Sequence, residues 1–284
     1  MGVVLVTGCR SGFGQRIAIE AARRGHTVYA GLRDLSTAGP LLADTAGLAL
    51  HPVQLDVTDA AQREAAVARI LAEQGRLDGL VNNAGQALTG FLEQVDDDEL
   101  RALFELNVFA VWALTRAVLP AMREQRSGRV VMVGSVSGRV GMPGLGAYAA
   151  TKFALEGMSE AWRHELAPFG VSVAIVEPGP YATDLFDRNR RACRNAADAT
   201  SPYAPLVERI ERFTRERVEP AAGDPNDVAE RVCDLLEGPA PAFRHPMGPT
   251  ARLRTRFAAM APFGLVEWAV ERTLGLRSIV PPKP

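Results

Sequence analysis

The stretch Val3-Val4-Leu5-Val6-Thr7-Gly8-Cys9-Arg10-Ser11-Gly12-Phe13-Gly14 decides how the chain begins to fold. Its first four residues form a β-branched run of the kind buried in a parallel sheet. The apolar face of 15–24 predicts a helix directly after the glycines. A strand, a glycine turn and a helix together bring backbone N–H groups to a helix N-terminus, where a pyrophosphate binds without a basic side chain. We therefore predict a dinucleotide site at Gly8, Arg10, Ser11, Gly12, Phe13 and Gly14.

The second predicted strand, Thr27 to Leu32, ends where a dinucleotide-binding unit reads the adenosine ribose. An acidic residue there accepts a hydrogen bond from the 2′-hydroxyl and repels a 2′-phosphate. Leu32 holds this position here, and Arg33 follows it. A guanidinium bond to a 2′-phosphate is worth roughly 1.5–3 kcal/mol, so we expect NADP, with Arg10 adding to phosphate binding. Two alternatives stay open: a shifted register would make Asp34 the reader and favour NAD, and Arg33 could be an ordinary solvated loop charge.

Two further predicted strands end in residues that suit a cofactor. The strand from His51 to Leu55 ends at Asp56-Val57, whose carboxylate is placed to accept from an adenine amino group. After a helix over 61–74, the strand from Leu77 to Val81 ends in Asn82-Asn83-Ala84-Gly85, where small residues let a cofactor approach the backbone closely. The amide pair alone is also compatible with a simple turn. We assign Asp56, Val57, Asn83, Ala84 and Gly85 to the cofactor site.

Ser135, Tyr148 and Lys152 carry the predicted chemistry. Ser135 ends a strand-like run over 130–133, and a glycine-rich loop leads from it to a predicted helix that begins near Ala147. On that helix Tyr148 and Lys152 are four residues apart, so the ammonium lies beside the phenol. A nearby cation favours tyrosinate, and we expect it to lower the pKa of Tyr148 from its ordinary value of about 10. The group suits a carbonyl substrate, with Ser135, Met142, Leu145 and Tyr148 as the predicted substrate contacts.

The rest of the chain supplies helices and a covering segment. A long helical pattern over 96–116 carries Asn107 within its apolar face, where the amide holds a helix carbonyl open for a water or is an ordinary satisfied core residue. A strand over 171–176 ends in a turn at Pro178-Gly179, placed to wall one face of a cofactor ring. Residues 184–218 show no strand pattern and suit a helical flap over the pocket. We predict a helix over 227–236 and a last strand over 243–247.

The C-terminal segment from Arg252 to Leu274 is rich in apolar residues. We interpret it first as core packing, with a cover for the substrate mouth, a subunit contact or a membrane-surface contact as alternatives. We predict a catalytic domain over 1–250, with 184–218 as a substrate-loop insertion and 251–284 as a helical extension packed on it. The expected fold is α/β: a doubly wound parallel sheet of about seven strands with helices on both faces.

Composition excludes several other classes of protein. The 284 residues contain 47% hydrophobic side chains and carry a net charge of −1, which argues against a nucleic-acid partner. Three scattered cysteines and an N-terminus without a leader pattern indicate a cytoplasmic protein. The four histidines are too dispersed to predict a metal site. We see no apolar stretch long enough to cross a bilayer, so no transmembrane segment is expected.

Taken together, these motifs resemble the compact, single-domain short-chain dehydrogenases/reductases, which have a Rossmann-type fold. The resemblance covers 1 to about 185 and rests on T-G-x-x-x-G-x-G at 7–14, N-N-A-G at 82–85, Asn107, Ser135, Tyr148-x-x-x-Lys152 and P-G-x-x-x-T at 178–183. It implies Tyr148 as general acid/base, Lys152 as the residue that lowers its pKa and holds the nicotinamide ribose, and Ser135 as the group that polarises the carbonyl. It further implies that Asn107 fixes a relay water and that Thr183, with Pro178 and Gly179, contacts the nicotinamide.

The stretch 148–157, with Pro168-Phe169-Gly170-Val171 after it, is similar to the hydroxysteroid and retinol dehydrogenase branch, which acts on bulky apolar alcohols and ketones. Arg139 and Pro180 depart from that branch. We therefore expect an NADP(H)-dependent ketoreductase for an apolar small molecule, working as a homodimer or homotetramer. A non-catalytic NADP-binding redox sensor or scaffold is the alternative function. A sugar-nucleotide epimerase is a third, for which the longer substrate domain is missing.

Overall fold

A parallel seven-stranded sheet forms the centre of the molecule. The computed structural model describes residues 1–181 and 190–279. The strand order is β3-β2-β1-β4-β6-β7-β9. The bounds are β1 (Val3–Val6), β2 (Thr27–Leu32), β3 (Leu50–Gln54), β4 (Gly79–Asn82), β6 (Gly128–Val133), β7 (Val171–Pro178) and β9 (Arg244–Met247). Because the order reverses beside β1, the carboxyl ends of β1 and β4 open a crevice at the switch point. The predicted doubly wound sheet is confirmed.

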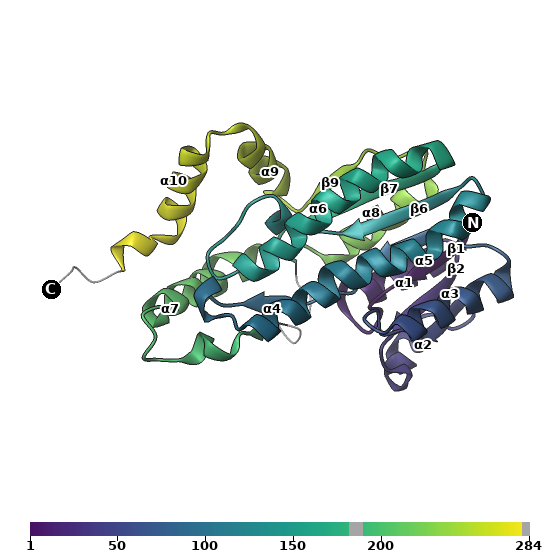
Figure 1. Cartoon of the computed structure of the whole chain (residues 1–284), viewed down its shortest axis with the longest axis horizontal. Coiled ribbons are helices and arrows are strands. Elements are labelled where there is room, and N and C mark those ends of the chain that lie inside the picture. Colours follow the sequence, from purple (N-terminus) through teal and green to yellow (C-terminus); the bar gives the residue numbers. More distant parts are fainter. Residues whose placement is uncertain (182–189, 280–284) are drawn as a thin grey trace.

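Helices cover both faces of the sheet (Figure 1). Alternate residues of each strand point to opposite faces, so Leu5 packs with α3 (Ala60–Gln74), α5 (Ala110–Glu124) and α6 (Gly146–Leu166). Val4 and Val6 pack on the other face with α1 (Gly12–Arg23), α2 (Gly39–Asp44) and α8 (Pro225–Glu237). Two dry apolar layers therefore hold the strand ends rigidly in place.

The long helix predicted over 96–116 is interrupted. It consists of α4 (Asp97–Phe104), a π-helical turn over Glu105–Phe109 and then α5. Asn107 lies in the π-helical turn, an irregularity common at functional sites. By length and composition the run Asp97–Glu124 could cross a membrane, so the expectation that no stretch is long enough is wrong. Its apolar face packs in the core through Val111, Leu114, Val118 and Met122, as in the core helix of a globular domain.

The covering segment differs from its prediction because it contains a strand. β8 (Arg190–Ala192) pairs in parallel with β5 (Ala87–Thr89), so the expectation of a strandless segment is wrong. Three residues that pair with a distant partner leave no recognisable pattern of their own. The helical part of the prediction agrees with a short turn over Arg194–Ala197 and with α7 (Ala204–Phe213), which a π-helical turn over Thr214–Val218 extends.

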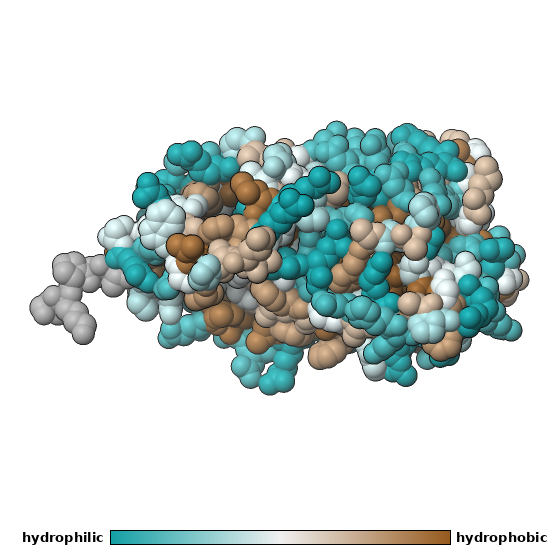
Figure 2. Space-filling model, turned by 90° about the horizontal axis from the view of Figure 1, so that it is seen from above, coloured by the Kyte–Doolittle hydropathy of each residue, from teal (hydrophilic) through white to brown (hydrophobic). Residues whose placement is uncertain are grey.

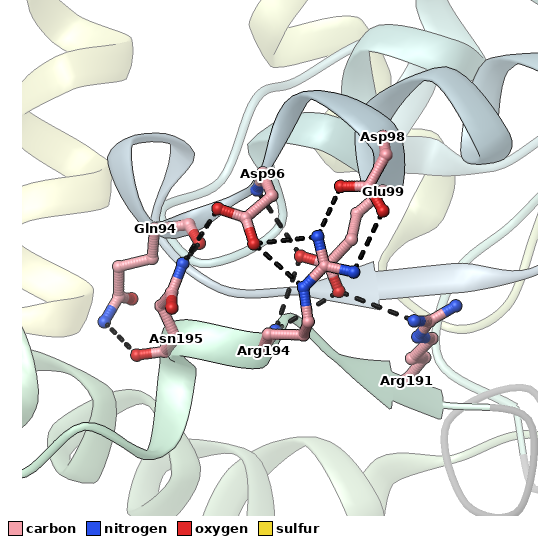
Figure 3. Close-up of polar contacts among 7 residues, drawn as sticks. All are labelled: Gln94, Asp96, Asp98, Glu99, Arg191, Arg194 and Asn195. Carbon is pink, nitrogen blue, oxygen red and sulfur yellow. Dashed lines mark hydrogen bonds and ion pairs between the residues drawn. The ribbon is translucent and has the colours of Figure 1, made fainter.

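A cluster of ion pairs attaches this segment to the start of α4 (Figure 3). Arg194 bonds Asp96 through Nε at 2.9 Å, and its guanidinium also spans both carboxylate oxygens of Asp98. The buried carboxylate of Glu99 accepts the backbone N–H of Arg194 at 3.2 Å. Asn195 and Gln94 exchange two side-chain to backbone bonds of 2.9 and 3.1 Å. The segment is thus attached to the scaffold at 194–195.

The C-terminal segment forms two helices, α9 (Ala251–Met260), which contacts the edge strand β9, and α10 (Phe263–Leu274), which lies away from the sheet (Figure 1). Five of the apolar side chains predicted to pack in the core are exposed instead: Phe257, Met260, Phe263, Leu265 and Trp268. The core-packing interpretation is therefore wrong for these residues, because α9 and α10 contact the domain along narrow faces such as that of Ala251 and Thr255. The division of the chain at 250 stays a prediction.

Candidate active site

Thr7 ties the end of β1 to the end of β4. Its hydroxyl oxygen accepts the backbone N–H groups of Asn83 and Ala84, both at 2.9 Å. The amide of Asn83 donates in return to the Thr7 carbonyl at 2.8 Å. Asn83 therefore fixes the glycine turn rather than offering its amide freely, and the switch-point crevice has a rigid floor. Thr7 was missed as a site residue, because only the meeting of two strands 76 residues apart shows its role.

The glycine turn packs its own backbone closely at the start of α1. Gly12 begins α1 with a φ of +61°, a conformation that glycine adopts without strain. A Cβ on Gly14 would lie 2.3 Å from the Gly8 carbonyl oxygen, so no side chain fits there. Ser11 precedes the helix, but its side chain does not cap the first turn. The N–H groups of that turn therefore point at the crevice without a capping side chain, as pyrophosphate binding requires.

Phe13 has a different environment from the other residues of the predicted pyrophosphate site. Its ring packs edge-on against Tyr181, with ring centroids 5.5 Å apart. Backbone contact with a phosphate remains compatible with this position, whereas the side chain belongs to the packing between α1 and the end of β7.

Arg33 and Arg10 flank Asp34 just beyond β2. The Asp34 carboxylate accepts the backbone N–H of Ser36 at 2.9 Å and so caps the 3₁₀ turn Leu35–Ala38. Hydrogen bonds from Ser36 hold the pKa of Asp34 below its ordinary value, and the charges of Arg10 and Arg33 lower it further. The carboxylate is thus used within its own loop, while Arg33 is exposed. Both guanidinium charges are therefore felt at Asp34, beside the predicted ribose position.

Asp56 and Val57 lie beyond β3, as predicted. The Asp56 carboxylate oxygen Oδ1 accepts from the backbone N–H and the hydroxyl of Thr58, at 3.0 and 2.7 Å. The Val57 carbonyl accepts from Arg63 at 2.6 Å. Local bonds therefore set the direction of both residues before any ligand binds.

Ser135 and Tyr148 meet above the end of β6. Both side chains are buried, and a hydrogen bond joins them. The Ser135 hydroxyl oxygen also accepts the backbone N–H of Ser137 at 3.1 Å, and the hydroxyl donates to the Pro178 carbonyl at 3.5 Å. Three elements thus fix the serine, and the phenol faces it from α6. Two hydroxyl groups converge on one point, which suits a carbonyl or alcohol oxygen.

Lys152 lies one helical turn beyond Tyr148. Its ammonium donates to the Val133 carbonyl at 2.8 Å and lies 5.6 Å from the centroid of the Tyr148 ring. Burial lowers the pKa of Lys152 to about 8 and raises that of Tyr148 to about 12, with the Ser135 bond acting in the opposite direction. The expected lowering of the Tyr148 pKa is therefore wrong for the protein by itself, since loss of solvation outweighs the effect of the Ser135 hydrogen bond.

Asn107 links two parts of the site. Its carbonyl oxygen accepts the backbone N–H of Gln86 at 3.0 Å, and its amide donates to the Gln86 carbonyl at 2.9 Å. The same amide donates to the Thr151 hydroxyl at 3.1 Å, which in turn donates to the Tyr148 carbonyl at 2.7 Å. Asn107 thus holds the chain after β4 against the helix that carries the phenol. Thr151 was missed, because a threonine within a helix gives no signal of its own.

Arg139, one of the two departures from the hydroxysteroid and retinol dehydrogenase branch, contacts a buried acidic pair. Its guanidinium lies 3.3 Å from Glu177, and Arg244 lies 2.9 Å from Glu156. Both glutamates are almost fully buried. Neither glutamate has a local sequence signal of its own, because Glu177 lies at the end of a strand and Glu156 on a helix. Only the fold brings them together.

A cavity of about 670 Å³ lies beside the loop that joins Ser135 to α6. Met142, a predicted substrate contact, lines this cavity, whereas Leu145, another predicted contact, is not among its lining residues. Apolar and aromatic groups form much of its wall, including Phe91, Leu92, Pro143, Phe153 and Tyr203. On the other side of the loop, the N–H of Gly179 donates to the Met247 carbonyl at 2.9 Å, which fixes the turn after β7. Thr183 lies outside the described residues.

Comparisons with known proteins agree with this geometry. A family model described as short chain dehydrogenase matches 2–194. The chain is 36% identical to human 17-beta-hydroxysteroid dehydrogenase type 1 over 257 residues, which cover 86% of this chain and 76% of that protein. It is 31% identical to 3-ketodihydrosphingosine reductase of Bacteroides thetaiotaomicron, over 97% of this chain and 98% of that one. The crystal structure of a short-chain dehydrogenase from Streptomyces avermitilis superposes with a TM-score of 0.82 at 37% identity, covering 94% of this chain and 96% of that one.

Proposed function

The chain belongs to the short-chain dehydrogenase family, and from this membership we propose that it transfers hydride between NADP(H) and a secondary alcohol or ketone on an apolar small molecule. The family assignment makes it an oxidoreductase that acts on CH–OH groups or ketones and binds NAD(P). The observation that carries the proposal is the convergence of Ser135, Tyr148 and Lys152 beside a crevice that fits a pyrophosphate.

We assign the proton chemistry to Tyr148. The bound nicotinamide supplies or accepts the hydride. A phenol whose pKa burial raises to about 12 stays protonated at neutral pH, so it is ready to donate a proton to a carbonyl oxygen. Ser135 would hold the same oxygen from the other side. In the oxidative direction the phenol must lose its proton first, and the charge of Lys152, one helical turn away, favours that loss.

Lys152 and Asn107 have supporting roles in this proposal. A lysine with a pKa of about 8 is mostly charged at neutral pH, and its ammonium keeps donors free for the ribose hydroxyls of a nicotinamide. Asn107 would keep α6 in register with the chain around Gln86 through Thr151. Pro178, Gly179 and Thr183 would contact the nicotinamide ring.

The proposed preference for NADP rests on the loop beyond β2. Arg33 and Arg10 supply positive charge beside the predicted ribose position. Asp34, the residue that would favour NAD, already accepts from Ser36. A 2′-phosphate would therefore meet two guanidinium groups, whereas a 2′-hydroxyl would meet a carboxylate engaged elsewhere.

An apolar substrate is supported by the cavity of about 670 Å³ and its aromatic wall. A volume of this size admits a ring system or a long alkyl chain. The names of two relatives, a hydroxysteroid dehydrogenase and a ketodihydrosphingosine reductase, also refer to large apolar molecules.

We further propose that the protein self-associates through α5 and α6 and works in the cytoplasm. Phe109, Trp112 and Phe153 are exposed on these two elements and on the π-helical turn before α5. Burying such a patch against a second copy removes apolar surface from water.

The proposed location in the cytoplasm is supported by the cysteines. All three are free and buried, which suits a reducing compartment.

The test is a titration of the purified protein with NADPH and NADH, followed by turnover of a panel of apolar ketones at saturating cofactor. Tighter NADPH binding with oxidation of NADPH by one ketone class supports the proposal. Tighter NADH binding would overturn the assignment of Arg33, and cofactor binding without any turnover would favour the redox sensor.

A further inference from the structure

Helix α9 presents an exposed apolar stripe. Leu253, Phe257 and Met260 follow one another at intervals of four and three residues, so they lie on one side of the helix. Leu253 is 73% exposed and Met260 is 83% exposed. Ala251 and Thr255 form the opposite, buried face. The helix is therefore attached along one edge and leaves its largest apolar groups in water.

Helix α10 extends this exposed surface. Phe263 is 79% exposed and Trp268 is 58% exposed, with Leu265 between them. The two helices contact each other, and α10 also contacts α7. Figure 2, seen from the side on which α9 and α10 lie, shows brown and tan residues among teal ones next to the grey C-terminal residues. Six of the fifteen large apolar residues exposed in the described chain lie on these two helices, so the exposure is concentrated.

Positive charge borders the apolar stripe of α9. Arg252 and Arg256 lie one position before Leu253 and Phe257, so a basic stripe runs beside the apolar one. These two arginines line a cavity of about 430 Å³ together with Arg139, Arg231 and Arg244. Within the described part of the chain no carboxylate lies within ion-pair distance of Arg252, Arg254 or Arg256. Residues 251–279 carry five arginines against two glutamates, whereas the whole chain carries 32 basic and 33 acidic residues.

We propose that α9 and α10 bind the surface of an anionic lipid bilayer. The side chains of Leu253, Phe257, Met260, Phe263, Leu265 and Trp268 would enter the boundary between headgroups and acyl chains. Arg252 and Arg256 would contact the lipid phosphates. Helices that lie in a bilayer surface combine these same features, namely Trp, Phe and Leu on one side and arginine beside them.

A bilayer suits this surface better than a second copy of the chain does. If α9 packed against α9 of another copy, the two basic stripes would approach each other without acidic partners and would repel. An anionic bilayer surface would attract the basic stripe instead of repelling it, and the acyl chains beneath would accept the apolar stripe.

Binding of α9 to a bilayer would affect how substrate reaches the site. This step rests on the function proposed above. α9 contacts the 3₁₀ turn Val136–Gly138, directly after Ser135. A bilayer held by α9 would therefore lie close to the loop that begins the substrate site. We infer that the substrate class is a membrane-partitioned alcohol or ketone taken from the bilayer.

The test is co-sedimentation of the full chain with two kinds of vesicle, phosphatidylcholine alone and phosphatidylcholine with about 30% phosphatidylglycerol, which has roughly the charge density of an anionic membrane. We expect binding to the anionic vesicles that weakens with added salt. The variant Leu253→Ser/Met260→Ser/Phe263→Ser should lose at least about tenfold in vesicle affinity. Arg252→Gln/Arg256→Gln should bind more weakly and depend less on salt. Leu42→Ser/Leu48→Ser, which changes two exposed leucines elsewhere, is the matched control and should bind as the wild type does.

Two further measurements separate this proposal from the proposed function. Turnover of a short water-soluble ketone should be equal in the wild type and in all three variants. If that ketone is reduced but no vesicle binds, the docking proposal is wrong and the oxidoreductase assignment stands. If vesicles bind but no ketone is reduced, the docking proposal stands without the reaction. If the triple variant changes the oligomeric state by light scattering and wild-type vesicle binding is absent, α9 and α10 form a subunit contact, and the proposal is overturned.

Discussion

The buried side chains of Glu156 and Glu177 share two arginine partners in the space between α6 and β7. Arg244 lies 2.9 Å from Glu156 and 3.9 Å from Glu177, and Arg139 lies 3.3 Å from Glu177 and 4.0 Å from Glu156. Each keeps one carboxylate oxygen, Oε1 of Glu156 and Oε2 of Glu177, away from every donor in the described chain. Burial and the charge of Glu156 both disfavour ionisation of Glu177. Arg139 and Arg244 face the pair, and Lys152 lies one turn before Glu156 on α6. A buried carboxyl group with a raised pKa thus lies in the same part of the fold as Lys152.

The proton that Glu177 binds predicts how stability depends on pH. Burial and the neighbouring charge of Glu156 together raise the pKa of Glu177 to about 7, against the effect of Arg139 and Arg244. The folded chain therefore binds this proton more tightly than the unfolded chain, whose glutamates titrate near 4.5. Its stabilising effect is full below about pH 4.5 and is lost as the pH rises through 7. In the wild type, the free energy of unfolding measured in urea should fall by an amount of the order of 2 kcal/mol between pH 5.0 and about 7.5. In Glu177→Gln we expect this fall to be absent.

Glu160→Gln is the matched control for this prediction. Glu160 also bonds Arg244, but its side chain is half exposed and its pKa is lowered, so its charge stays constant above pH 5. The pH range of the measurement ends near 7.5 because the pKa of Lys152 is lowered to about 8. Above that pH, the titration of Lys152 changes the free energy of unfolding in the opposite direction. A Glu177→Gln protein with the same pH slope as the wild type would show that Glu177 binds no proton in this pH range.

Tyr148→Phe removes the proposed proton donor and keeps the ring. We expect kcat to fall by roughly 10² to 10⁴, the usual contribution of a positioned acid/base group, while NADPH binding by fluorescence titration is retained. Tyr29→Phe is the control, because Tyr29 is also buried and bonds Glu73 at 2.6 Å on a part of the sheet far from the site. It should change stability and leave kcat unaltered. Full activity in Tyr148→Phe would remove the phenol from the mechanism.

Local patterns allowed much of the site to be predicted. The glycine turn, the Tyr148–Lys152 spacing and the serine at a strand end each depend on fewer than about twenty neighbouring residues, and periodicity determines their elements. Contacts between distant segments could not be predicted in this way. Three such contacts become visible only when the sheet order is known: the hydrogen bond between Thr7 and Asn83, the Glu156–Glu177 pair and the pairing of β5 with β8. The direction of the Tyr148 pKa was missed for the same reason, since the degree of burial depends on the whole fold.

Arg33→Gln tests the proposed reader of the 2′-phosphate. Loss of a charge-assisted bond predicts a roughly tenfold to hundredfold weaker Kd for NADPH, with the Kd for NADH nearly unchanged. The effect should shrink at high salt, because Arg33 is exposed. Arg23→Gln, an exposed arginine at the far end of α1, controls for net charge. Equal weakening of both cofactors would mean that Arg33 contributes general attraction rather than a choice between them.

Arg194→Gln tests whether the ion-pair cluster of Figure 3 holds the covering segment in place. The variant loses the bonds to Asp96 and Asp98 but keeps the backbone N–H that Glu99 accepts. We expect limited proteolysis within 184–218 to become about two- to fivefold faster, since local opening needs less free energy when those bonds are gone. Arg101→Gln is the control, because it removes an exposed pair with Asp97 on the same helix without touching the segment. Because the segment covers the proposed substrate cavity through Tyr203, KM for a bulky ketone should rise in Arg194→Gln while the Kd for NADPH stays constant. An unchanged cleavage rate and an unchanged KM would show that Asn195 and Glu99 suffice to hold the segment.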